Sequence, residues 1–325
     1  MNRSSLRLAS VVALAAAALF TLPLVAQQDV PPAPAQGADV AAGPAFPKPE
    51  ATDFTADAPT KDQVYNFLQA SWGYDPNRVF QVQRILKTQV AGVENVVILV
   101  GEKGAKQISV LQFFVTPDLK HIITGGEILP FGDHPYAENR ATLAARANGP
   151  SEGAASKDLE LVEFADFQCP HCKDAQATVA KIAADFPNAH IVYQSFPLVK
   201  IHAQAFRAAA YGACVAKLGG NAAFFQYADA VYEGQAGLAT DEGATLTLSS
   251  AATKAGQDPE KVEACSKTPE TKATVDAGIK LAEDLGVNQT PSLAINGRLI
   301  PLGGIQYDTL KQMIAYHVAH DAPAK

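Results

Sequence analysis

The sequence predicts an α/β domain with a central sheet interrupted by a helical insertion, preceded by a small α+β domain. In the second half of the chain, short apolar strands alternate with helical segments, and one long stretch between strands is helical throughout. In the first half, one helix is followed by strands with short connections, which indicates an antiparallel sheet. A length of 325 residues with 48% hydrophobic side chains is enough for two buried cores.

Residues 1–26 are typical of a secretory signal peptide. Arg3 and Arg7 precede an apolar run from Val11 to Ala26 without acidic residues, and a polar, proline-rich stretch follows. The apolar run is short for a membrane span and contains Pro23, so an uncleaved anchor is the less favoured alternative. We expect cleavage after Ala26 and export to the periplasm, an extracytoplasmic compartment in which disulfides persist.

The overall charge is acidic, with 26 basic and 33 acidic side chains and a formal net charge of −7. Removal of residues 1–26 makes the chain more acidic still, because two arginines and no acids leave with them. An acidic chain argues against nucleic acid as a partner.

Residues 27–52 are predicted to form a linker, because they contain six prolines among alanines and glycines and almost no large apolar side chain. We interpret this linker as an unstructured tail left after export. A spacer that holds the protein away from a membrane is the alternative.

Residues 53–131 are predicted to form the small α+β domain. The sequence from Thr60 to Gln63 is that of a capping box, which predicts a short helix after it. Three or four antiparallel strands are expected to follow, at residues 79–86, 93–101, 107–115 and 121–129. A connecting helix is predicted within residues 132–150, where Gly149 and Pro150 would end it.

Residues 151–325 are predicted to form the second domain. The expected order is a strand at 159–167, a helix at about 169–186, a strand at 190–196, a helical insertion at about 202–286, strands at 292–295 and 298–301, and a helix at 307–320. Asn296-Gly297 between the last two strands predicts a tight hairpin.

The most informative motif is Cys169-Pro170-His171-Cys172, which lies between the first strand of this domain and the following helix. A cysteine at the first turn of a helix faces unpaired backbone N–H groups and the positive end of the helix dipole, and both favour its thiolate. Cys169 is therefore the predicted nucleophile. Cys172 lies close enough to attack a mixed disulfide on Cys169, so the pair can cycle between dithiol and disulfide.

Two cysteines with this spacing also form half of a zinc site. Cys214 and Cys265 stand alone, without a second C-x-x-C or a nearby pair of histidines to complete four ligands. Zinc is therefore the less favoured interpretation, and we expect neither a metal nor an organic cofactor.

Residues 159–325 resemble the DsbA family of thioredoxin-fold oxidoreductases. The resemblance rests on the segments LVEFADFQCPHC, QSFPLVKIHAQAFRAA and GVNQTPSLAINGR, in that order, with a helical insertion between the last two. It implies a thioredoxin-like fold with Cys169 as the attacking and Cys172 as the resolving cysteine. The dipeptide Pro170-His171 is typical of strong oxidants, so His171 would stabilise the thiolate of Cys169, the alternative being a solvent-facing side chain without a redox role.

The resemblance implies two further site elements. Glu163 occupies the position of a buried acid, where a raised pKa would let it relay a proton to or from Cys172; a strand-edge side chain in solvent is the alternative. Thr290-Pro291 matches the cis-proline loop, which would bind an extended substrate segment as an added strand. Threonine before this proline is commoner in isomerases than in the strongest oxidants, so the choice between oxidase and isomerase stays open.

Some relatives have a structural disulfide in the helical insertion, and the resemblance therefore implies one between Cys214 and Cys265. Two separate buried thiols are the alternative. We assign His202 to packing rather than to catalysis.

The layout of residues 53–131 weakly resembles the dimerisation domain of DsbC-like isomerases, which would give a homodimer. The preferred function is an exported thiol-disulfide oxidoreductase that donates the Cys169–Cys172 disulfide to reduced exported polypeptides and is reoxidised by a membrane protein. A dimeric isomerase or reductase acting on misoxidised polypeptides is the first alternative. An envelope chaperone or assembly factor is the second.

Overall fold

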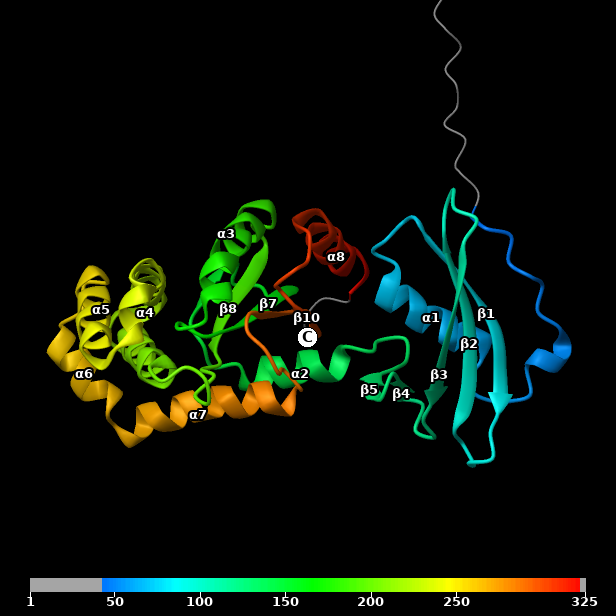
Figure 1. Ribbon diagram of the computed structural model, residues 1–325, viewed down its shortest axis with the longest axis horizontal. Helices are drawn as coiled ribbons and strands as arrows, with labels where there is room; N and C mark the ends of the chain where they lie inside the picture. Colours follow the sequence, from blue (N-terminus) through cyan, green and yellow to red (C-terminus); the bar gives the residue numbers. More distant parts are fainter. Residues whose placement is uncertain (1–42, 322–325) are drawn as a thin grey trace, which may run out of the picture. The chain divides into compact units, whose positions relative to one another are not determined.

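The structure is a computed structural model that describes residues 43–321, and within them the chain forms two five-stranded sheets (Figure 1). The predicted signal peptide and residues 27–42 of the predicted linker lie outside the described residues. The predicted α/β domain with a helical insertion is present, and the predicted small α+β domain precedes it.

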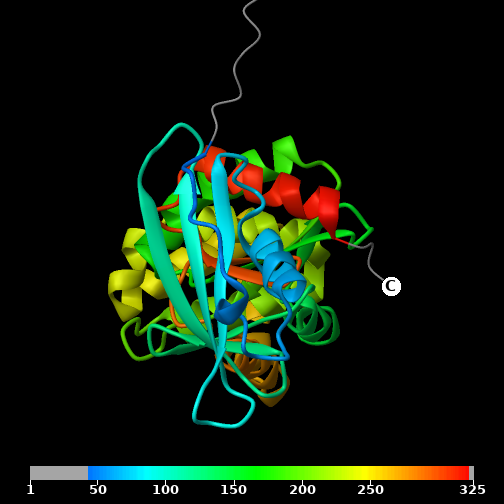
Figure 2. The same ribbon diagram turned by 90° about the vertical axis from the view of Figure 1, so that its right-hand side faces the viewer.

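The first sheet is an antiparallel meander in which each strand pairs with the next along the chain. Its strands are β1 (Arg78–Lys87), β2 (Glu94–Glu102), β3 (Ile108–Val115), β4 (His121–Thr124) and β5 (Glu127–Pro130). Helix α1 (Lys61–Trp72) precedes it, and the capping box is present: the Thr60 hydroxyl accepts the Gln63 N–H, and the Gln63 side chain accepts the Thr60 N–H. Helix α1 lies against one face of this sheet (Figure 2), and its buried side chains belong to the same hydrophobic cluster as those of the strands.

Two predictions for this region are wrong in detail. The fourth strand expected at 121–129 is a hairpin, β4 and β5, because Gly125 and Gly126 adopt φ angles of 56° and 85° and reverse the chain. The predicted linker also ends early, since Ala51–Asp53 form the short 3-10 helix η1 and the Pro47 carbonyl accepts a hydrogen bond from the Gln81 side chain.

The second sheet has the strand order β10-β9-β7-β8-β6. Its strands are β6 (Ser151–Gly153), β7 (Leu159–Ala165), β8 (Ala189–Ser195), β9 (Ser292–Ile295) and β10 (Arg298–Pro301). The central strand β7 is parallel to β8 and antiparallel to β9, and every one of its residues is buried. The edge strand β6 is absent from the sequence prediction because three residues give no periodic pattern.

Helices cover both faces of this sheet. Helices α3 (Pro170–Asp185) and α8 (Tyr307–His320) pack on one face, and α2 (Ala137–Arg146) and α7 (Pro269–Asp284) pack on the other (Figure 1). The motif with Cys169 and Cys172 follows the end of β7, where the chain enters α3.

The helical insertion between β8 and β9 contains α4 (Ala205–Glu233), η2 (Gln235–Ala239), α5 (Asp241–Lys254), α6 (Pro259–Ser266) and α7. Asp258 and Thr268 cap α6 and α7, each followed by a proline at the first helical position. Buried side chains of α4, α5 and α6 form one hydrophobic cluster with Cys169 and Cys172. The insertion therefore covers one side of the two cysteines.

Among the helices in residues 43–321, none is both long enough and apolar enough to cross a membrane.

Candidate active site

The two cysteines of the C-x-x-C motif lie at the start of α3. Cys169 is the N-cap residue, Pro170 occupies the first helical position, and Cys172 follows within the first turn. The two cysteines are not joined by a disulfide, and both residues are buried, with 5% of Cys169 and none of Cys172 exposed. Proline at the first position loses no helical hydrogen bond, because the N–H of that position has no partner within the helix.

Hydrogen bonds to the sulfur lower the pKa of Cys169 to about 5. The largest contribution comes from the Cys172 thiol, followed by Thr290 and by the backbone N–H groups of Cys172 and His171, while burial acts in the opposite direction. Cys169 is therefore a thiolate at neutral pH. The side chain of His171 is exposed, so the structure places the backbone of this residue, rather than its imidazole, at the sulfur.

The pKa of Cys172 is raised well above its ordinary value, first by its hydrogen bond to the Cys169 sulfur and then by burial. The backbone N–H of Asp166, 3.4 Å from the Cys172 sulfur, acts in the opposite direction. Near neutral pH the pair thus consists of an ionised Cys169 and a protonated Cys172. This is the asymmetry that an attacking and a resolving cysteine require.

Glu163 lies on the central strand β7, between β8 and β9, and only 2% of it is exposed. The alternative of a strand-edge glutamate in solvent is therefore wrong. Gln176 of α3 donates hydrogen bonds of 3.1 Å to Glu163 Oε1 and of 3.0 Å to the Cys172 carbonyl oxygen, which links the acid to the resolving cysteine. Burial raises the pKa of Glu163 to about 7. A group with that pKa can take up and release a proton near neutral pH.

Replacing Glu163 with glutamine is expected to stabilise the folded protein above pH 7. The folded-state pKa is about 7 and the ordinary value is 4.5, so between these pH values the folded state binds more protons than the unfolded state. Stability therefore falls as the pH rises through this window. The Glu163→Gln variant has no carboxyl group to ionise, so its free energy of unfolding should exceed that of the wild type by about 3 kcal/mol at pH 8. Below about pH 4.5 the two proteins should be equally stable.

Urea unfolding of the wild-type protein and of Glu163→Gln at pH 4 and pH 8 measures this difference. Glu233→Gln is the matched control, because the Glu233 side chain is 75% exposed and should show almost no such dependence on pH. Equal stability of wild type and Glu163→Gln at pH 8 would contradict the buried-acid interpretation.

The loop before β9 contributes the third element of the site. The Thr290–Pro291 peptide bond is cis, and the Thr290 carbonyl oxygen lies 3.5 Å from the Cys169 sulfur. Both residues are buried. The fold thus brings Cys169, Glu163 and Thr290 from three separate segments to one end of the second sheet.

Aromatic side chains close the site toward the helical insertion, and the sequence analysis did not identify them. Phe167 stacks on Tyr193 with ring centroids 5.1 Å apart, and the hydroxyl groups of Tyr193 and Tyr232 are 2.8 Å apart. All three residues are buried in the cluster that contains Cys169 and Cys172.

Asp166 and His202 form a second pair that the sequence analysis did not identify. The Asp166 side chain is fully buried, and its Oδ2 lies 2.7 Å from Nδ1 of His202. The packing role expected for His202 includes a contact with an acidic side chain, since Asp166 lies in the loop between β7 and α3. The sequence contains one signal for this contact: Asp166 directly follows an apolar strand and lies three residues before Cys169. Aspartate is seldom buried in a core without a partner, so a polar contact near Cys169 is the expected role for it.

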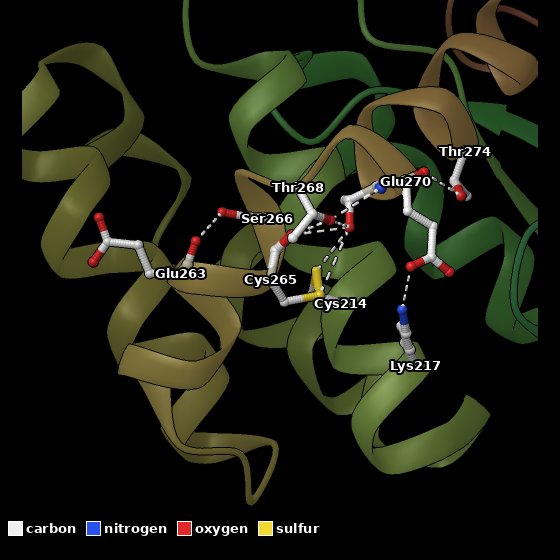
Figure 3. Close-up of a disulfide and its surroundings, with 9 residues drawn as sticks. Cys214, Lys217, Glu263, Cys265, Ser266, Thr268, Glu270 and Thr274 are labelled. Atoms are coloured by element: carbon white, nitrogen blue, oxygen red, sulfur yellow. Dashed lines mark hydrogen bonds and ion pairs between the residues drawn. A yellow bond between two sulfur atoms is a disulfide. The ribbon is translucent and has the colours of Figure 1, made fainter.

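The predicted disulfide between Cys214 and Cys265 is present, and the alternative of two separate thiols is wrong (Figure 3). It joins α4 to α6. The Thr271 hydroxyl lies 3.3 Å from the Cys214 sulfur and 3.7 Å from the Cys265 sulfur. Across residues 43–321, no three side chains among His, Cys, Asp and Glu are grouped so that they could hold a metal ion.

Comparison with protein families gives one match over this part of the chain. The family model described as thioredoxin matches residues 147–315, which include the motif with Cys169 and Cys172, the helical insertion and the loop with Pro291.

The curated proteins similar to the chain include two that are named Na(+)/H(+) antiporter. It is 30% identical over 142 residues to NhaA 1 of Mycolicibacterium vanbaalenii, a match covering 43% of this chain and 22% of that protein. It is 26% identical over 146 residues to NhaA 3 of Salinispora tropica, covering 45% of this chain and 21% of that protein. The matched region thus spans about a fifth of the length of these relatives.

Solved structures similar to the chain include a periplasmic thioredoxin-like protein from Salmonella enterica serovar Typhimurium, with 24% identity and a TM-score of 0.46. That match covers 56% of this chain and 97% of the other. A thioredoxin-like oxidoreductase from Silicibacter pomeroyi matches with 26% identity and a TM-score of 0.46, covering 56% of this chain and 98% of the other.

Proposed function

The chain belongs to the thioredoxin family and is a thiol-disulfide oxidoreductase, and from this premise we propose that it forms disulfide bonds in exported proteins by donating the Cys169–Cys172 disulfide. The observation that supports donation is the opposite effect of the site on its two sulfurs. The pKa of Cys169 is lowered to about 5, and that of Cys172 is raised. Stabilising the thiolate of Cys169 stabilises the reduced enzyme, which makes its disulfide a stronger oxidant.

The proposed reaction begins with the oxidised enzyme. A substrate thiolate attacks the Cys169 sulfur, the Cys169–Cys172 bond breaks, and Cys172 leaves as a thiolate that takes up a proton. A second substrate thiolate attacks the substrate sulfur of the mixed disulfide, and Cys169 leaves as a thiolate. The substrate loses two electrons and gains a disulfide, and the enzyme becomes a dithiol.

Glu163 and the loop that contains Thr290 assist these steps. Glu163 has a pKa of about 7 and interacts electrostatically with the Cys172 thiol, so we assign to it the proton that the leaving Cys172 sulfur takes up, with Gln176 holding the acid in place. The Thr290 loop holds an extended segment of the substrate next to Cys169 by adding it as a strand, with Pro291 fixing the loop.

Export belongs to the same proposal. Residues 1–26 would direct the chain to the periplasm, where its partners are reduced or misoxidised polypeptides and a membrane protein that takes two electrons from the Cys169–Cys172 dithiol. Oxidising surroundings also fit the presence of the Cys214–Cys265 disulfide.

The reduction potential of the Cys169–Cys172 pair tests this function. It is measured by equilibration with glutathione in a variant in which Cys214 and Cys265 are both replaced by alanine, so that only one pair titrates. A value of roughly −120 to −180 mV would support disulfide donation or isomerisation. A value near about −270 mV would overturn the proposal in favour of a reductase.

Isomerisation by a homodimer is the second candidate, and one observation favours it. Val110, Phe114 and Ile128 of the first sheet are 65%, 38% and 68% exposed, and the strand register puts them on the same face. Exposed apolar side chains on one face support a contact between two copies through residues 53–131. A dimer in analytical ultracentrifugation that also refolds a scrambled disulfide protein would establish this candidate. Peptide binding that persists without both catalytic cysteines would instead indicate a chaperone.

A further inference from the structure

Asp166 and His202 have no part in the exchange chemistry described so far, although Asp166 contacts both cysteines. We propose that they form a positioning pair that keeps the Asp166 N–H on the Cys172 sulfur, and so stabilises this sulfur whenever it becomes a thiolate. The proposal rests on the proposed function, because it assigns these residues to one step of disulfide exchange.

The carboxyl group of Asp166 is fixed from two sides. Its Oδ1 accepts the Gln168 N–H at 2.8 Å, within the active-site loop. Its Oδ2 accepts the Leu198 N–H at 2.9 Å and lies 2.7 Å from His202 Nδ1, both in the segment that connects β8 to α4. The Asp166 side chain has no exposed surface, and that of His202 is 17% exposed. A buried acid with three hydrogen-bond partners has one orientation, because any other leaves those partners unpaired.

The backbone of the same residue touches the redox pair. The Asp166 N–H points to the Cys172 sulfur at 3.4 Å, and the Asp166 carbonyl oxygen accepts the Cys169 N–H at 3.1 Å. The hydrogen bonds of the carboxyl group therefore fix the position of Asp166, and its backbone N–H and C=O groups contact the two cysteines. His202 acts on the sulfur through Asp166.

The step that needs this contact is the one in which Cys172 is an anion. When Cys172 resolves a mixed disulfide, its thiol loses a proton, its sulfur attacks the Cys169 sulfur, and the bond from Cys169 to the other thiol breaks, releasing that thiol as a thiolate. The cluster around Cys172 is apolar, and the pKa of Cys172 is raised. A backbone donor pointed at the sulfur lowers the cost of this anion.

The test follows the lifetime of the mixed disulfide between Cys169 and glutathione. The reduced wild type and the reduced variants Asp166→Asn and His202→Leu are mixed with glutathione disulfide, acid-quenched at short intervals and measured by mass spectrometry, so that the rise and decay of the adduct are followed in each. In Asp166→Asn the side-chain NH₂ group must face one of the N–H donors that the carboxylate accepts in the wild type. In His202→Leu the side chain offers no donor to Asp166. Both variants should resolve the adduct about tenfold more slowly than the wild type.

A second readout separates this role from a structural one. The rate at which iodoacetamide alkylates Cys169 should keep its midpoint near pH 5 in both variants, because the bonds to the Cys169 sulfur come from other groups. His202→Gln, which retains an N–H donor, should resolve the adduct within about threefold of the wild type. Because His202 is less buried than Asp166, its two variants keep the test available if Asp166→Asn does not fold.

Asp118 and His121 provide the matched control, since they form an Asp–His pair of 2.9 Å on the first sheet with both side chains about half exposed. His121→Leu should leave adduct resolution unchanged. Resolution at the wild-type rate in His202→Leu would overturn the proposal, and so would a loss that also moves the Cys169 alkylation midpoint. A Cys172→Ala variant whose Cys169 forms no adduct with glutathione disulfide would instead overturn the proposed function itself.

Discussion

Replacing Cys169 with serine is expected to abolish disulfide exchange with every thiol substrate. The nucleophile of exchange is a thiolate, and Cys169 is the cysteine whose pKa the site lowers, to about 5. A serine hydroxyl does not ionise near neutral pH and forms no disulfide. Cys172 cannot substitute for the lost sulfur, because it is fully buried and its pKa is raised. Oxidation of a reduced peptide containing two cysteines, followed by mass spectrometry, measures the loss.

The other cysteines provide controls for this experiment. Cys172→Ala should still attack glutathione disulfide but should accumulate the mixed disulfide, since nothing resolves it. In this variant the pH midpoint for alkylation of Cys169 should also lie above 5, because the largest contribution to the lowered pKa of Cys169 comes from the Cys172 thiol. The double variant Cys214→Ala and Cys265→Ala should exchange as the wild type does. Substantial peptide oxidation by Cys169→Ser would exclude the assigned nucleophile.

Local features of the sequence predicted the elements around this site closely. The hairpin strands β9 and β10 and helix α8 begin and end at the predicted residues, because their limits depend on neighbours in sequence. Asn296 and Gly297 adopt positive φ angles of 46° and 90°, as the tight turn between the strands requires. The start of α3 is local in the same sense, since it depends on the Cys169-Pro170 pair and the strand before it.

Contacts between distant segments could not be predicted in this way. Asp166 and His202 are 36 residues apart, and no periodicity shows that the loop after β8 meets the loop after β7. The contribution of His171 was assigned to its side chain because the motif gives residue identity and not orientation. The burial of Glu163 was implied by a resemblance, whereas the structure explains it through the position of β7 in the middle of the sheet.

Removing the Cys214–Cys265 disulfide is expected to lower the free energy of unfolding by about 4 kcal/mol, on the basis of loop-closure entropy. The two cysteines are 51 residues apart, so the bond closes a long loop of the unfolded chain. That loop contains most of the helical insertion, from α4 through α5 to α6. Urea unfolding of the double alanine variant and of the wild type measures the difference. The Cys169–Cys172 pair must be in the same redox state in both proteins, and the Cys214–Cys265 disulfide must be intact in the wild type.

The double variant is the appropriate one, because a single substitution leaves a free thiol that can exchange with Cys169. A loss below about 1 kcal/mol would contradict the prediction, since it would mean that the unfolded chain gains little freedom when the bond is absent. The bond lies between α4 and α6, whereas the donors to the Cys169 sulfur come from the start of α3 and from Thr290. The variant should therefore lose stability while the midpoint of Cys169 alkylation stays near pH 5, which separates the structural disulfide from the redox-active pair.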